Sequence, residues 1–262
     1  MMLKSCLLFL PYQLRCVRKL FLVALTNEVD LSLLKRNGFN IEELRLCVFT
    51  GNKDDRGCVD GETNAVLKQQ IANNIFFTSN GSDVDVLFTG IGKINATYAL
   101  TRYICEIGKP DVIYNIGTAG CCHDDIDVGD LVLCDKFIQL DMNATPQNPN
   151  EIGFTPYDDI GFIIDNGVVS EENYHFIKDI KNGNYICATM DTFNVADINY
   201  DVYDMEAYAL AKVALRFGID FVCVKYITDN ILNNKKKKTD EDWKNALEDG
   251  RKKLTNLIIG CL

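Results

Sequence analysis

Apolar residues in this chain form continuous runs rather than alternating with polar ones. LFLVAL at 20–25, DVLFTG at 85–90 and DVIYNIGTAG at 111–120 are the clearest of these runs. A continuous run of this kind is typical of a strand that is buried on both faces of a sheet. Further strands are predicted over 129–141, 184–191 and 221–229.

Between the predicted strands, apolar residues recur at helical spacing. KINATYALTRYICEIG at 93–108 has this period and ends at Gly108, a residue that commonly terminates helices. Alternating strands and helices are typical of an α/β fold in which helices flank a mostly parallel sheet. Further helices are predicted over 171–181, 205–218 and 240–258.

Polar side chains interrupt this pattern where the predicted strands end. Glu28, Thr118, Asp191 and Asp229 each lie at or just after such an end. In open α/β folds, ligands bind beyond the carboxyl ends of the parallel strands. We therefore expect these four residues to converge on one crevice.

Two glycine-flanked turns follow predicted strands. TGIGK at 89–93 lacks the third glycine of a dinucleotide fingerprint and the Lys-Ser/Thr ending of a phosphate-binding loop. It is therefore either a tight turn or a loop whose backbone approaches a ligand closely. IGTAG at 116–120 has Thr118 at its centre, where the hydroxyl either completes a structural turn or binds a water molecule or an anion.

Three other residues have two interpretations each. Phe193, in TMDTFN, either packs in the core or presents its ring face to a base. Glu206 opens a predicted helix, where the helix dipole favours a carboxylate as a cap, but a cap does not need Met205 before it or Ala207 after it. Asp229 either caps the following segment or donates a proton with a raised pKa. Spacing alone leaves these alternatives open.

Composition narrows the class of protein. The chain has 262 residues and a net charge of −10, and a general nucleic-acid-binding protein needs a basic surface instead. No run approaches the ~18 apolar residues needed to span a bilayer. The 11 cysteines and two histidines lack the spacing of a metal site, and reduced cysteines are typical of a cytoplasmic protein. Composition is unbroken, so we expect one domain over 20–262 after an N-terminal extension over 1–19.

Five segments together resemble a known superfamily. TGIGKINA, PDVIYNIGTAG, VGDLVLCDKF, DMEAYALAKVA and VKYITDN occur in the order and approximate spacing of the purine nucleoside phosphorylases and nucleosidases. The chain is most similar to the 5′-methylthioadenosine/S-adenosylhomocysteine nucleosidases. The resemblance implies a central twisted, partly barrel-like sheet and cleavage of an N-ribosidic bond without metal or cofactor. It also implies a purine nucleoside as substrate and assembly into a homodimer.

The resemblance implies how the nucleoside is held. Glu206 with Met205 would bind the ribose, and Asp229 would protonate N7 of the purine. Phe193 would stack on the base, and the backbone around Asn194 would contact its edge. Positive charge develops on the sugar and negative charge on the leaving purine, so an anion at one and an acid at the other stabilise the transition state.

The resemblance also implies how the nucleophile is held. Glu28 would activate a water molecule that Thr118 helps to position. Lys225 stands where these nucleosidases often have arginine, so it would contact the water without the planar geometry of a guanidinium. Ile91 and Asp191 are the remaining positions expected to line the site.

The segment TNEVD at 26–30 distinguishes hydrolysis from phosphorolysis. It supplies an acid, Glu28, near the place where phosphorylases of this superfamily usually have an arginine for phosphate. An acid repels phosphate and suits water, so we expect a nucleosidase that releases the free base and a ribose product. A phosphate-dependent phosphorylase and an inactive nucleoside-binding module are the alternatives.

Overall fold

The computed structural model describes most of the chain. Phe193 and Asn194 lie outside the described residues, as does the predicted extension up to residue 17. The described ranges are 18–23, 28–43, 75–79, 83–144, 152–160, 163–166, 171–192, 200–232 and 240–261.

The described strands form one ten-stranded sheet. At its centre, β1 (Lys19–Val23) pairs in parallel with β4 (Val84–Phe88) on one side and with β5 (Val112–Cys121) on the other. β5 in turn pairs in parallel with β10 (Asp220–Asn230) along almost its whole length. These parallel strands end on the same edge of the sheet, which is where ligands bind in such folds.

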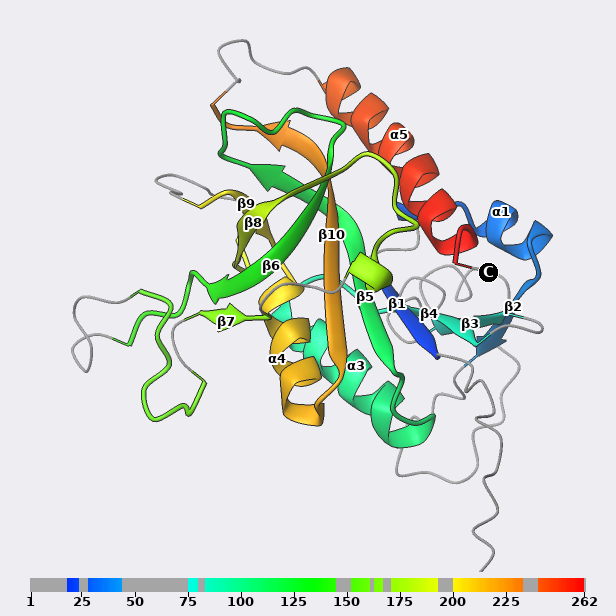
Figure 1. The fold of residues 1–262 in the computed structure, drawn as a ribbon, viewed down its shortest axis with the longest axis horizontal. Coiled ribbons are helices and arrows are strands. Elements are labelled where there is room, and N and C mark those ends of the chain that lie inside the picture. The colour runs from blue at the N-terminus through cyan, green and yellow to red at the C-terminus, as the bar shows by residue number, and fades with distance from the viewer. Residues whose placement is uncertain are drawn as a thin grey trace, which may run out of the picture.

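The sheet closes on itself beyond β10. β6 (Leu131–Gln139) pairs with β10, β8 (Ile180–Thr189) with β6, and β9 (Val202–Asp204) with both β8 and β5. The strands β5, β10, β6, β8 and β9 therefore form a closed ring, the partly barrel-like arrangement that the resemblance implied (Figure 1).

Shorter strands lie at the margins of the sheet. β3 (Ile75–Ser79) and β2 (Phe39–Glu43) extend it in antiparallel fashion beyond β4. β7 (Ile164–Asp165) adds a two-residue antiparallel pairing to β6.

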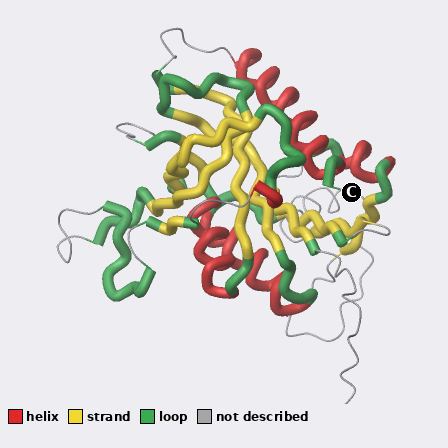
Figure 2. Tube along the Cα trace, in the orientation of Figure 1, coloured by secondary structure: helices red, strands yellow, loops and turns green. Residues whose placement is uncertain are grey.

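Helices cover both faces of the sheet (Figure 2). The helices α3 (Lys93–Glu106) and α4 (Ala207–Phe217) pack through one hydrophobic cluster on one face. The helices α1 (Leu31–Arg36) and α5 (Asp240–Ile259) pack through a second cluster on the other. This layered arrangement confirms the predicted α/β fold.

Strand β1 is apolar from Leu20 to Val23 because both of its faces are covered. Leu20 and Leu22 belong to the cluster under α3 and α4, whereas Phe21 and Val23 belong to the cluster on the side of α1 and α5. Successive side chains of a strand point to opposite faces, so a strand with helices on both faces needs apolar residues at every position.

The helix predicted over 171–181 is wrong. The segment begins with a short 3₁₀-helix (Glu171–Asn173), continues in turns, and enters β8 at Ile180. Asp179, just before β8, has a φ of 57°, which lies outside the right-handed helical region. Ile177 is buried in the cluster beside α5, so its apolar character reflects packing rather than helical periodicity.

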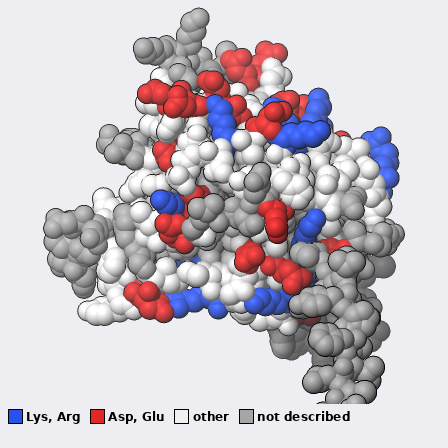
Figure 3. Space-filling view, in the orientation of Figure 1, with Lys and Arg blue, Asp and Glu red and all other residues white. Residues whose placement is uncertain are grey.

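Charged side chains of both signs lie on the surface (Figure 3). Figure 3 shows acidic and basic side chains interspersed over the face that it draws.

None of the helices in the described ranges combines the length and the apolar character that crossing a bilayer requires.

Candidate active site

Glu28 and Thr118 meet at the carboxyl ends of β1 and β5. The Glu28 side chain is buried, with 7% of its surface exposed. Its Oε1 accepts hydrogen bonds from the backbone nitrogen of Thr118, at 3.1 Å, and from the Thr118 hydroxyl, at 3.0 Å. The predicted juxtaposition of these two residues is therefore present, although 90 residues separate them.

Lys225 approaches the same place from β10. It pairs in register with Gly117 of β5, and a methyl group added at Gly117 would lie 3.4 Å from Glu28 Oε1 and 3.8 Å from Lys225 Nζ. Both groups thus face the space above Gly117, where an added methyl group would be in van der Waals contact with each of them.

A buried ion pair holds Lys225. Its Nζ lies 2.8 Å from Oδ2 of Asp204, and the two side chains are 2% and 0% exposed. Burial alone would lower the pKa of Lys225 and raise that of Asp204. The opposite charges outweigh burial, so the pKa of Lys225 is well above its usual value and that of Asp204 is below it. Both groups are ionised at neutral pH.

Asp204 is also the cap of α4. Its Oδ2 accepts from the backbone nitrogen of Ala207 at 2.8 Å, and its Oδ1 accepts from the Thr189 hydroxyl at 2.7 Å. Sequence reasoning missed Asp204, although an acid two residues before Glu206 in YDMEA was a visible signal.

Glu206 makes no side-chain cap bond to α4, so the helix-cap interpretation is wrong. Its Oε1 instead accepts from the backbone nitrogen of Gly92, at 2.9 Å, in the glycine turn that precedes α3. Burial and then the charge of Asp204 raise the pKa of Glu206 to about 8. The carboxyl group is 6% exposed and faces the turn rather than its own helix.

The glycine turn itself is held by Asp191. Oδ1 of Asp191 accepts from the backbone nitrogen of Lys93 at 3.0 Å, and Lys93 Nζ lies 2.9 Å from Asp191 Oδ2 and 2.6 Å from Asp141 Oδ2. Gly92 has a φ of +89°, and an added methyl group would lie 3.2 Å from Asp191 Oδ1. Ile91, in the same turn, is 41% exposed.

Asp229 follows a bulge near the end of β10, where it pairs with Gly120. Its Oδ2 accepts from the Tyr203 hydroxyl at 2.5 Å, and its Oδ1 accepts from the Thr228 hydroxyl at 2.9 Å. The partners described for Asp229 are hydroxyl groups, not the backbone amides of a helix start. Tyr203 was not anticipated from the sequence.

Most of the predicted site residues therefore lie at one edge of the sheet. Glu28 and Thr118 are in direct contact, and the Asp204–Lys225 pair joins them to the segment that carries Met205 and Glu206. Met205 is half-buried between the two acids of that segment. No cluster of potential metal ligands occurs within the described ranges.

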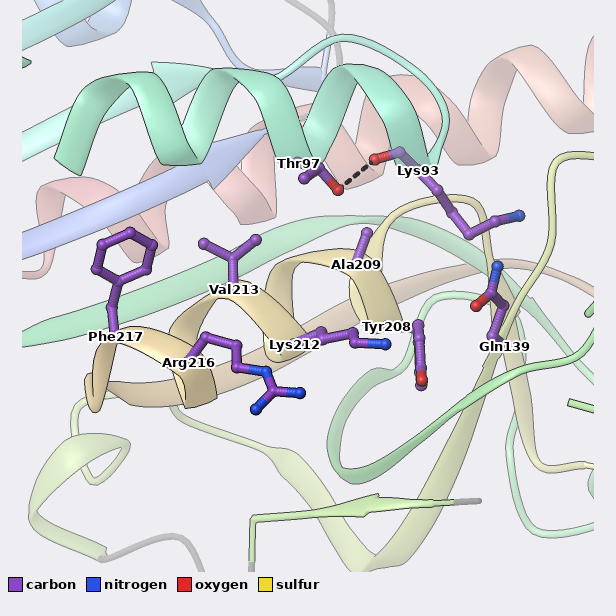
Figure 4. Close-up of a pocket in the computed structure, with 9 residues that line it drawn as sticks. All are labelled: Lys93, Thr97, Gln139, Tyr208, Ala209, Lys212, Val213, Arg216 and Phe217. Atoms are coloured by element: carbon purple, nitrogen blue, oxygen red, sulfur yellow. Dashed lines mark hydrogen bonds between the residues drawn. The ribbon is translucent and has the colours of Figure 1, made fainter. Parts of the chain in front are cut away.

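A further hollow lies between α3 and α4 (Figure 4). Its volume is about 370 Å³, and the Thr97 hydroxyl on its α3 side donates to the Lys93 carbonyl at 2.8 Å. Ala209 and Val213 point from α4 toward α3, whereas the side chains of Lys212 and Arg216 point away from α3. The lining of the hollow is Lys93, Thr97, Gln139, Tyr208, Ala209, Lys212, Val213, Arg216 and Phe217.

Comparison with known proteins decides the family. The family model described as the phosphorylase superfamily matches residues 66–262. The chain belongs to this superfamily. A 5′-methylthioadenosine/S-adenosylhomocysteine nucleosidase of Bacillus licheniformis is 30% identical over 206 residues, which cover 73% of this chain and 87% of that protein. The nucleosidase of the same name from Geobacillus sp. is 32% identical over 173 residues, covering 61% and 74%. The resemblance to these nucleosidases is thereby confirmed.

Solved structures agree on the fold. The Campylobacter jejuni 5′-methylthioadenosine/S-adenosylhomocysteine nucleosidase aligns with a TM-score of 0.67 at 18% identity, covering 94% of this chain and 98% of that one. The futalosine hydrolase of Helicobacter pylori aligns with a TM-score of 0.66 at 19% identity, covering 93% and 97%. At this identity the likeness concerns the fold, which is shared along almost the whole chain.

Proposed function

We propose that this protein hydrolyses the N-ribosidic bond of 5′-methylthioadenosine, S-adenosylhomocysteine or a related purine nucleoside. Water is the nucleophile, and the products are the free base and the free ribose derivative. The observation that carries the proposal is the position of the Glu28 carboxylate, which accepts both hydrogen bonds that Thr118 offers at the end of β5.

The occupied donors favour water over phosphate. An anion bound at this part of β5 would need the nitrogen and hydroxyl of Thr118, and both already donate to Glu28. The nearby cation, Lys225, is paired with Asp204. A phosphate placed here would be repelled by the negative charge of Glu28, whereas a water molecule can donate a proton to that carboxylate.

The remaining acids suit the charges that develop during the reaction. Glu206 accepts ribose hydroxyls through the part of its carboxyl group that Gly92 does not occupy. Hydrogen bonds from a sugar stabilise the ionised carboxylate, so binding releases a proton from Glu206, whose pKa is about 8. Asp229 donates to N7 of the departing purine, and Met205, Phe193 and Asn194 complete the pocket around the nucleoside.

We propose further that the protein is a cytoplasmic homodimer. Ile94 and Tyr98 on α3 are 83% and 57% exposed, and Phe217 at the end of α4 is 38% exposed. Together with the hollow between these helices, they form an apolar surface suited to a self-complementary interface. The cysteines within the described ranges are all free, as expected in a reducing compartment.

An assay of products tests the function. The protein is incubated with 5′-methylthioadenosine in the presence and in the absence of phosphate, and adenine and the sugar product are quantified. We expect equal adenine release under both conditions and free methylthioribose as the sugar. Release that requires phosphate and yields a sugar 1-phosphate would indicate a phosphorylase, and binding without any release would indicate an inactive binding module.

Sedimentation tests the dimer. Ile94→Asp places a charge in the apolar surface and should shift the protein to the monomer. Val128→Asp is the matched control, because Val128 is 39% exposed in the loop between β5 and β6, away from this surface. A wild-type monomer, or a dimer that Ile94→Asp leaves intact, would contradict the proposed interface.

A further inference from the structure

Tyr203 stands beside Asp229 in an arrangement that the proposed reaction does not yet use. Its hydroxyl donates to Asp229 Oδ2 at 2.5 Å. Its ring lies directly against the backbone of Gly120, since a methyl group added there would lie 2.0 Å from the ring carbon Cζ. The phenol therefore reaches Asp229 across Gly120 of β5, and only a glycine at that position leaves room for the ring.

The two oxygens of Asp229 have separate partners. Tyr203, from β9, donates to Oδ2, and Thr228, from β10 itself, donates to Oδ1. The register of β10 against β5 shifts at a bulge just before Asp229, which then pairs with Gly120. Gly120 in turn pairs with Tyr203 of β9. The hydroxyl of Tyr203 supplies a constraint from a different strand.

The Tyr203 hydroxyl stays protonated and can therefore always donate a hydrogen bond to Asp229. Burial, followed by the hydrogen bond to Asp229 and the charge of that carboxylate, raises the pKa of Tyr203 far above its usual value. The hydroxyl consequently keeps its proton throughout the physiological range. Tyr203 immediately precedes Asp204, so one short strand orients both Asp229 and the ion pair of Lys225.

We propose that Tyr203 is a positioning residue that orients the Asp229 carboxyl group toward the purine, and that Gly120 is required to seat its ring. The inference rests on the proposed function. It predicts that removal of the phenolic hydroxyl weakens the chemical step and leaves nucleoside binding nearly unchanged, because Tyr203 acts on the purine through Asp229.

Tyr203→Phe is the first test. The ring remains, only the oxygen is lost, and the melting temperature should stay close to that of the wild type. A hydrogen bond to a charged group is commonly strong enough that its loss lowers a rate about 10- to 100-fold. We expect kcat to fall by this factor while KM changes less than about twofold, a split that a general loss of structure would not produce.

Gly120→Ala is the second test, and it changes the residue against which the Tyr203 ring packs. The added methyl group displaces the ring and with it the hydroxyl, so kcat should fall about as far as in Tyr203→Phe. In a Tyr203→Ala background the ring is gone, and Gly120→Ala should then cause little further loss. This non-additivity is expected only where two residues act through one contact.

The protein contains a matched control. Tyr226 donates to Asp249 Oδ2 at 2.9 Å, and its ring packs against Gly250, where a methyl group would lie 2.7 Å from a ring carbon. Tyr226, Asp249 and Gly250 thus make the same kinds of contact between β10 and α5 as Tyr203, Asp229 and Gly120 make elsewhere. Tyr226→Phe should leave kcat unchanged, because Asp249 has no role in the proposed reaction. If Tyr203→Phe keeps the wild-type kcat, or if its kcat falls no further than that of Tyr226→Phe, the inference about Tyr203 is wrong while the proposed function stands. A wild-type protein that releases no base overturns the proposed function and this inference together.

Discussion

Two clusters of acids and cations differ in their burial: one lies buried at the strand ends, and the other lies at the surface beside α4. The buried cluster consists of Glu28, Asp204, Glu206 and Lys225. The surface cluster consists of Asp158, Asp159, Lys212 and Arg216. Lys225 and Asp204 are 2% and 0% exposed, whereas Arg216 and Asp159 are 47% and 73% exposed.

The pKa values of carboxyl groups shift in opposite directions in the two clusters. At the surface, the hydrogen bond from Arg216 holds the pKa of Asp159 well below its usual value. In the buried cluster, burial and the charge of Asp204 raise the pKa of Glu206 to about 8. Desolvation and the number of acids per cation therefore decide whether a carboxyl group stays a permanent anion or exchanges protons near neutral pH.

The largest expected effect comes from the acid that faces the nucleophile. Glu28→Gln keeps the shape of the side chain and removes its ability to take a proton from water. We expect kcat for adenine release to fall by about 10²–10⁴-fold, the usual contribution of a general base, with little change in KM. Asp159→Asn in the surface cluster is the matched control and should keep the wild-type rate. A Glu28→Gln variant with normal kcat would exclude Glu28 as the base.

The buried ion pair should dominate stability. Lys225→Met leaves Asp204 charged and unpaired in the interior, which typically costs about 3–5 kcal/mol of the free energy of unfolding. Adding Asp204→Leu removes the orphaned charge and should recover part of that loss, although the cap of α4 is lost with it. Urea denaturation of the two variants measures both steps. Equal stability of Lys225→Met and the wild type would mean that the pair is not desolvated in solution.

The raised pKa of Glu206 should make stability depend on pH. Between its unfolded value near 4.5 and the folded value of about 8, the folded protein holds a proton that the unfolded chain has released. Stability contributed by this group is thus fully present below about pH 4.5 and decreases as the pH rises, by up to about 1.4 kcal/mol per pH unit.

Urea denaturation between pH 5 and pH 8 measures this dependence. Glu206→Gln cannot titrate and should show a shallower decline than the wild type. Parallel declines in the two proteins would show that Glu206 is already ionised at pH 5.

The smallest expected change in stability comes from a substitution in the surface cluster. Arg216→Met removes the guanidinium from Asp159, whose side chain is 73% exposed, and from Asp158, which keeps its ion pair with Lys212. Exposed ion pairs contribute little to stability. We expect the melting temperature to change by less than about 2 °C. Compared directly with Lys225→Met in the same thermal scan, this variant isolates the effect of burial, since both remove one cation. A comparable loss in the two variants would refute the contrast.

Part of the fold was readable from the residues. Continuous apolar runs marked β1, β4, β5 and β10, because helices cover these strands on both sides. The same reasoning wrongly predicted a helix over 171–181, where the buried Ile177 lies in a segment of turns. The strand β9 escaped prediction because three residues are too few to show a period.

Part of the site was readable as well. Glu28, Thr118, Asp191 and Asp229 were placed at the strand ends by their interruption of apolar runs, and Glu206 was placed at the start of a helix. Asp204 and Tyr203 were not anticipated, because the partners that define their roles are Lys225, on another strand, and Asp229, 26 residues further along the chain.

The sequence alone determined the alternation of buried strands and helices and which polar residues interrupt it, since both follow from local patterns of hydrophobicity. Only the tertiary structure decided what each carboxyl group does. Asp204 caps α4 and neutralises Lys225, which leaves Glu206 to face Gly92, 114 residues away. The pKa of Glu206 and the orientation of Asp229 depend on desolvation and on partners from other strands, and those arise only when the sheet closes.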